Sequence, residues 1–71
     1  MKQTNAIKFG NYVIVLEKEQ LSYYVNGELA AVKDVHPEFN SKDLFDLGKR
    51  IALKKDTGAV QYVNKSDYIK K

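Results

Sequence analysis

Apolar positions recur in short, alternating runs along most of the chain, a pattern typical of β-strands. The runs at 6–9 and 12–18 are separated by Gly10-Asn11, which suits a two-residue hairpin turn because glycine accepts a positive φ at the first turn position. One long strand with a bulge at Gly10 is the alternative. The second run is apolar at every position from Tyr12 to Leu16, which favours a central strand covered on both faces.

The clearest hairpin signal follows a charged turn at 17–20 and lies in SYYVNGELAAV, residues 22–32. Asn26-Gly27 between two apolar runs is typical of a type I′ turn, which needs a positive φ at both central residues. A two-residue turn predicts strand pairs that run outward from Val25–Glu28 to Leu21–Val32. Alternation then predicts two faces, one with Leu21, Tyr23, Val25, Ala30 and Val32 and the other with Ser22, Tyr24, Leu29 and Ala31.

A short helix is predicted over 41–47, after a loop at 34–39 that contains a proline. Asn40 is a good N-cap residue, and the charge of Asp43 suits the positive end of the helix. Gly48 is expected to end the helix as the residue after the C-cap. So short a helix is not stable alone, and its apolar side chains are therefore expected to pack on the sheet.

Beyond the helix, RIALKK (50–55) alternates and predicts a further strand, with Ile51 and Leu53 pointing inward. The segment 56–58 is expected to turn the chain, and AVQYV (59–63) to return it as the last strand.

The predicted fold class is α+β, in a single small domain that spans 1–71 and ends in a short C-terminal turn or tail at 64–71. We expect a small curved antiparallel sheet of five or six strands, barrel-like if it closes, with one short helix. The order of the elements is β-β-β-β-α-β-β, and the five-stranded version fuses the first two segments.

The absence of cysteine and the presence of a single histidine restrict the chemistry of the chain. Disulfides, cysteine zinc sites and thiol nucleophiles are excluded, and we expect no enzyme activity, no catalytic residue, no cofactor and no metal ligand. The N-terminal segment lacks the apolar core of a signal peptide, and no apolar run approaches the roughly 20 residues of a membrane helix. We therefore expect a cytoplasmic protein that does not bind membranes.

Asp56-Thr57-Gly58 resembles the catalytic triplet of retroviral-type aspartic proteases, in which one aspartate from each half forms a dyad with a shared proton. In that family the triplet follows an apolar strand, whereas Lys54 and Lys55 precede it here. A plain β-turn also favours aspartate and glycine at these places, and we interpret the triplet as a turn.

Basic charge is concentrated in the last third of the chain. Residues 1–48 hold five lysines and seven acids, a net charge of −2, and 49–71 hold seven basic and two acidic residues, a net charge of +5. Such asymmetry favours an anionic partner. Nucleic-acid binding is therefore one hypothesis, in which a basic surface is combined with a tyrosine that stacks on bases. Its residues would be Arg50, Lys54, Lys55, Tyr62 and Lys65.

The hairpin face that carries Tyr24, Leu29 and Ala31 is more apolar than a plain solvated face. Exposed apolar patches usually mark contact surfaces, and tyrosine is enriched at interfaces. Our first hypothesis is a small protein-binding module, of adaptor or inhibitor type, that binds another protein, or a second copy of itself, through this face. The alternative is that the sheet curls and buries both faces within one monomer. We expect no small-molecule substrate.

Overall fold

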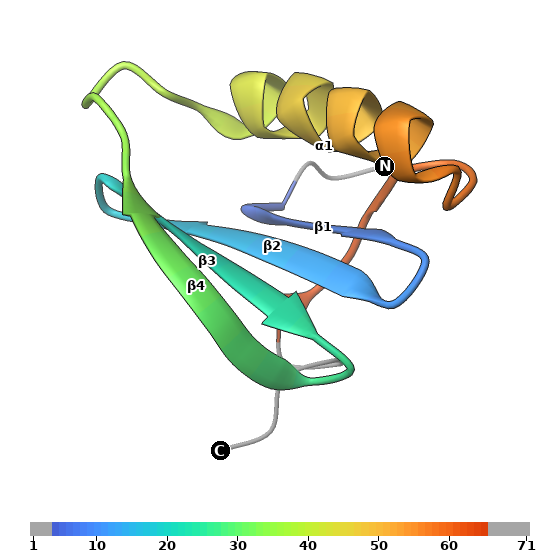
Figure 1. Cartoon of the computed structure of the whole chain (residues 1–71). Coiled ribbons are helices and arrows are strands. Elements are labelled where there is room, and N and C mark those ends of the chain that lie inside the picture. The colour runs from blue at the N-terminus through green and yellow to red at the C-terminus, as the bar shows by residue number, and fades with distance from the viewer. Residues whose placement is uncertain (1–3, 66–71) are drawn as a thin grey trace.

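The computed structural model describes residues 4–65, in which one helix crosses one face of a five-stranded antiparallel sheet (Figure 1). The elements in chain order are β1 (Ala6–Phe9), β2 (Tyr12–Glu17), β3 (Gln20–Val25), β4 (Glu28–Asp34), α1 (Ser41–Lys55) and β5 (Gln61–Tyr62). The strands lie side by side in the order β4-β3-β2-β1-β5. The predicted α+β class with an antiparallel sheet is confirmed, and the sheet is open, with edges at β4 and β5.

The two predicted hairpin turns are present. Gly10 has φ +60° between β1 and β2, so the first two segments are separate strands rather than one bulged strand. Asn26 has φ +54° and Gly27 has φ +84°, the two positive values that a type I′ turn requires.

The predicted register of the β3–β4 hairpin is correct next to the turn and wrong beyond it. Tyr23 lies opposite Ala31 rather than Ala30, because a β-bulge falls between Tyr23 and Tyr24. A bulge adds one residue to one strand, so that the residues beyond it change face. Ala31 therefore lies on the α1 side with Tyr23, and Val32 joins Tyr24 on the opposite side, where the sequence predicted the reverse.

The predicted strand at 50–55 is wrong, because these residues form the second half of α1. Asn40 caps the helix as predicted, and the side chain of Asp43 completes a capping box. The helix does not end at Gly48, however, but continues to a C-cap at Asp56, which has φ +54°.

The physical reason for the longer helix lies in how its side chains are sorted. Leu44, Gly48 and Ala52 recur at helical spacing and form the buried face of α1. Leu53, which a strand would have turned inward, is 86% exposed. The alternation at 50–55 is too short to separate a strand from a helix by period alone.

The last strand is shorter than the predicted segment 59–63 and pairs with β1. The backbone N–H of Val63 extends this pairing by donating to the carbonyl of Ala6 at 3.0 Å. Of the predicted C-terminal turn or tail at 64–71, only 64 and 65 belong to the described residues.

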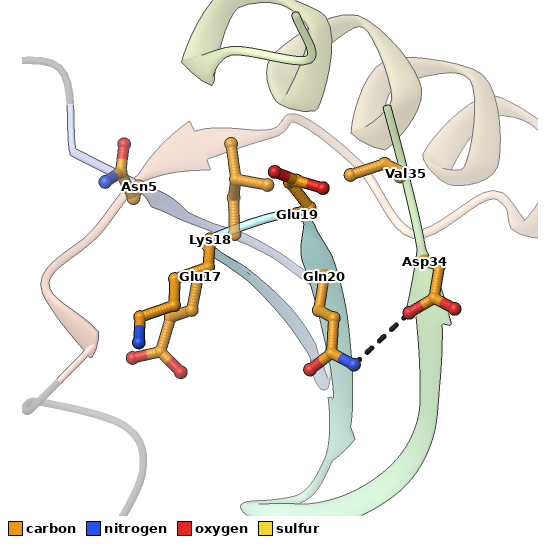
Figure 2. Close-up of a pocket in the computed structure, with 8 residues that line it drawn as sticks. Asn5, Glu17, Lys18, Glu19, Gln20, Asp34 and Val35 are labelled. Carbon is orange, nitrogen blue, oxygen red and sulfur yellow. Dashed lines mark hydrogen bonds between the residues drawn. The ribbon is translucent and has the colours of Figure 1, made fainter. Parts of the chain in front are cut away.

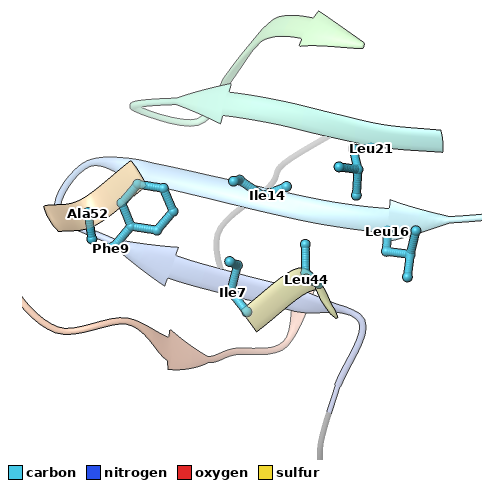
Figure 3. Packing of buried hydrophobic residues seen from close by; sticks show 7 residues of the cluster. All are labelled: Ile7, Phe9, Ile14, Leu16, Leu21, Leu44 and Ala52. Atoms are coloured by element: carbon cyan, nitrogen blue, oxygen red, sulfur yellow. The ribbon is translucent and has the colours of Figure 1, made fainter. Parts of the chain in front are cut away.

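The main hydrophobic core lies between α1 and the sheet (Figure 3). Its sheet side chains come from three neighbouring strands, and its helix side chains come from the buried face of α1. Fully burying one large aliphatic or aromatic side chain is worth about 1.5–3 kcal/mol, so this cluster dominates the stability of the domain. Its buried members are Ile7, Phe9, Ile14, Leu16, Leu21, Leu44 and Ala52.

A smaller apolar cluster covers the opposite face of β1 and β2 and consists of Ala6, Val13, Val15 and Val63. Because both faces of β2 are buried, the prediction of a covered central strand is confirmed. The coverage ends toward β4, where every residue is exposed.

The β2–β3 turn offers a test of backbone strain. Lys18 has φ +47° at the first position of this two-residue turn, and side chains other than glycine rarely adopt that conformation. We expect Lys18→Gly to raise the free energy of unfolding by up to about 1 kcal/mol, because the left-handed penalty of a residue with a Cβ, about 1–2 kcal/mol, exceeds the entropic cost of glycine, about 0.5–1 kcal/mol. Urea denaturation measures the change, and a loss of stability would contradict the left-handed conformation of Lys18.

Candidate binding surface

β4 is an outer strand of the sheet, and all seven of its residues are exposed. Within residues 4–65, no strand pairs with its outer edge. Such an edge presents unpaired backbone N–H and C=O groups to solvent. The opposite edge strand, β5, has only two residues, and shortness is one means by which proteins prevent pairing at an edge. The long edge of the sheet is therefore β4.

An apolar surface lies beside this edge, on the side of the sheet away from α1. It consists of Tyr24, Leu29 and Val32, and we name these three residues the hairpin patch. Leu29 is 57% exposed and Val32 is 50% exposed, whereas Tyr24 is half-buried against the smaller cluster, where it lies opposite Val13. The structure thus brings two of the three predicted contact residues together but places the third, Ala31, on the other face.

The α1 side of the sheet carries a groove of about 790 Å³ between the second half of α1 and the β3–β4 hairpin, which we name the α1–hairpin groove. It exists because α1 packs on β1 and β2 and does not reach across β4. Phe9 and Tyr12 line it with stacked rings, whose centroids are 5.5 Å apart. Tyr23 lines it from β3, and burial raises the pKa of its phenol.

Three lysines border this groove: Lys33 from β4, and Lys54 and Lys55 from the last turn of α1. The Lys55 ammonium lies over the Tyr12 ring, 5.6 Å from its centroid, in a cation–π arrangement. None of the described residues that line the groove is acidic. The groove therefore combines an apolar interior with a rim of positive charge.

Tyr62, the aromatic residue of the predicted nucleic-acid site, is half-buried and packs against α1. Its ring stacks on Phe45 of α1 with centroids 4.8 Å apart. Its hydroxyl donates a hydrogen bond to the backbone carbonyl of Ser41 at 3.1 Å. This arrangement fixes β5 to the helix and leaves the ring poorly placed to stack on a base.

The basic residues of that predicted site do not share one surface. Lys54 and Lys55 border the α1–hairpin groove, and Arg50 is exposed on α1. Lys65 instead binds the carboxylate of Glu17 on the sheet face away from α1. The hydrogen bond to Glu17 raises the pKa of the Lys65 ammonium group.

A polar pocket of about 1000 Å³ surrounds the β2–β3 turn and is lined in part by Glu17, Glu19 and Asp34 (Figure 2). Gln20 donates a hydrogen bond to Asp34 at 3.2 Å, and Glu17 binds Lys65, so two of these carboxylates have partners. Among residues 4–65, no group of three histidine or acidic side chains is placed to hold a metal ion. We assign no function to this pocket.

The chain was compared with known proteins in three ways. No protein-family model, curated protein or solved structure matches it. Within the described part of the chain, no helix is long and apolar enough to cross a membrane.

Sequence reasoning missed the α1–hairpin groove because it placed Lys54 and Lys55 in a strand. The signal that would have found it is the helical spacing of Leu44, Gly48 and Ala52, which extends α1 toward the hairpin. The bulge that moves Ala31 into the groove has no comparable signal in the sequence.

Proposed function

We propose that this protein is a small protein-binding module that receives an extended segment of a partner at the edge of β4. The observation that carries the proposal is that all seven residues of an edge strand are exposed, and that this strand has an apolar centre from Leu29 to Val32. When a strand is added to a sheet, backbone hydrogen bonds supply affinity and pockets for alternate side chains supply specificity.

The ends of β4 support a short and selective contact. Glu28 precedes the apolar centre, Lys33 and Asp34 follow it, and the bulge at Tyr23–Tyr24 interrupts the regular pairing. Charges and bulges at an edge discourage indiscriminate pairing with other strands. Between these charges lies a stretch of four uncharged residues, which includes Leu29 and Val32 of the hairpin patch.

Leu29→Asp is the variant that tests the proposal. Random peptides displayed on phage would be selected on the immobilised full chain, and the affinity of the most enriched peptide would be measured by fluorescence anisotropy. We expect the aspartate to weaken binding by about tenfold or more, equivalent to about 1.4 kcal/mol, because it places a charge in an apolar contact. Since Leu29 is 57% exposed, the thermal unfolding midpoint should change little.

The matched control is Leu53→Asp, which introduces the same charge at a leucine that is 86% exposed on α1. This variant should bind the selected peptide like the parent protein. Equal loss in both variants, or no enrichment of any peptide, would contradict the proposal. Sedimentation velocity tests self-association. If the parent protein is a dimer and Leu29→Asp dissociates it, the partner is a second copy of the chain.

Nucleic-acid binding has weaker support, because Tyr62 is packed against Phe45 and Lys65 is paired with Glu17. Only Arg50, Lys54 and Lys55 are left to form a shared basic surface.

A further inference from the structure

We infer that the partner segment is acidic on the side that faces α1, with carboxylates that meet Lys33, Lys54 and Lys55 on either side of an apolar side chain that enters the α1–hairpin groove. This inference rests on the proposed strand addition at β4. It specifies the chemistry of the partner, which the exposed edge alone does not.

A strand that pairs with the edge of β4 would also contact the α1–hairpin groove. A strand added beside β4 would continue the sheet, so its side chains would alternate between the two faces. One set would meet the hairpin patch, and the other would meet the α1–hairpin groove, which begins at β4 itself. On β4 the groove is lined by Ala30, Ala31, Val32 and Lys33, and the two alanines are small enough to leave room for a large partner side chain.

The interior of the groove favours an apolar anchor. Phe9 is only 1% exposed, and its ring stacks with that of Tyr12 to form an aromatic surface at the base. Val25 and Ile51 add aliphatic side chains from β3 and α1. An aromatic or branched aliphatic residue of the partner would bury apolar area here, and such anchors dominate the energetics of interfaces.

The rim of the groove favours carboxylates beside that anchor. Lys33, Lys54 and Lys55 come from opposite walls, and none of the described lining residues supplies a compensating acid. Lysines in this arrangement repel basic segments and attract acidic ones, which sets specificity and association rate more than raw affinity. The electrostatic contribution of these lysines to binding should weaken as salt is added, because they lie near the surface.

The test combines charge reversal with the composition of the selected peptides. We expect peptides selected on the parent protein to carry Asp or Glu at alternate positions around an apolar residue. The double variant Lys54→Glu with Lys55→Glu should bind the most enriched peptide with an affinity lower by about tenfold or more. The double variant Lys54→Gln with Lys55→Gln should lose less affinity. Replacing the peptide's acids by their amides should remove the difference between the parent protein and the charge-reversed variant.

The matched control is Lys42→Glu with Lys49→Glu, which makes the same change in net charge on α1 at two exposed lysines that do not line the groove. Binding of the acidic peptide by this variant should stay within about twofold of the parent. Thermal unfolding of all variants shows whether loss of the fold causes a loss of binding. If the variant with Lys54→Glu and Lys55→Glu is unstable, the variant with Lys54→Gln and Lys55→Gln still tests the inference.

The outcomes separate the inference from the proposed function. Enriched peptides that lose affinity with Leu29→Asp, but contain no acids or ignore the lysine variants, would overturn the inference and retain the strand-addition proposal. Absence of any Leu29-dependent peptide would overturn both. A third outcome concerns nucleic acid. In this outcome the parent protein selects no acidic peptides but binds labelled single-stranded DNA or RNA, and the double variant Lys54→Glu with Lys55→Glu abolishes that binding. This result would also overturn the inference and would assign the lysines to nucleic acid.

Discussion

Leu44→Ala should lower the free energy of unfolding by about 2–5 kcal/mol, because it leaves a cavity in the core between α1 and the sheet. Leu44 is 0% exposed and packs in the cluster with Ile7 and Ile14. At typical values per residue, a chain of 71 residues has a total stability of roughly 4–10 kcal/mol, so the variant should lose a large share of that stability. Urea denaturation followed by circular dichroism measures the change.

Leu53→Ala is the matched control on the same helix. Leu53 is 86% exposed, so its truncation should change the free energy of unfolding by no more than about 0.5 kcal/mol. The pair distinguishes the two interpretations of 50–55. In a strand with Leu53 pointing inward, Leu53→Ala would destabilise the protein about as strongly as Leu44→Ala, and that result would contradict a helix that extends to Lys55.

Gly48→Ala is expected to lower the free energy of unfolding by about 1–3 kcal/mol, although alanine is the better helix former by about 1 kcal/mol. Gly48 is buried where α1 crosses the sheet. An added Cβ would lie 2.2 Å from Cδ1 of Ile7 and 3.2 Å from Cγ1 of Val60. Because Ile7 is 0% exposed, its side chain cannot move away without disturbing the rest of the core.

A double-mutant cycle with Ile7→Val tests the cause of that loss. Ile7→Val removes Cδ1, the nearest atom, and should cost about 0.5–1.5 kcal/mol alone because it opens space in the core. In the double variant the new methyl group fills part of that space, so the combined loss should fall short of the sum by about 0.5 kcal/mol or more. A stabilising Gly48→Ala would show instead that α1 does not sit this close to β1.

The close approach of α1 to β1 also explains where the binding surface lies. Gly48 lets the helix approach Ile7 of β1 closely, and the Phe45–Tyr62 stack joins the helix to β5. With only one helix in the described residues, the α1 side of the sheet is covered at β1 and β2 and is left open at β4. The surface proposed for partner binding thus lies on the part of the sheet that α1 does not cover.

Much of the fold could be predicted from local patterns. The positive φ values at Gly10 and Asn26-Gly27 follow from residue types that tolerate them, and Asn40 begins the helix because its side chain accepts backbone hydrogen bonds there. The end of the helix was predicted wrongly. Glycine commonly follows a C-cap, but Gly48 serves packing against Ile7, a contact between residues 41 positions apart in the chain.

The candidate surface was predicted in part. Tyr24 and Leu29 lie together because both are between the Asn26-Gly27 turn and the bulge, where strict alternation still holds. Ala31 lies beyond the bulge and therefore faces the groove. Lys54 and Lys55 were identified as candidate binding residues, but their position beside the β3–β4 hairpin follows from their place in α1 and not from a strand.

The sequence by itself determined the turns, the helix start, the α+β class and the basic character of the last third of the chain. These features depend on single residues or on neighbours in the chain, so local patterns are sufficient to predict them. Only the tertiary structure decided the length of α1, the pairing of β5 with β1, the bulge in the hairpin and the groove between them. Each of these depends on contacts between distant segments, and such contacts outweigh the small local preferences of the residues that make them.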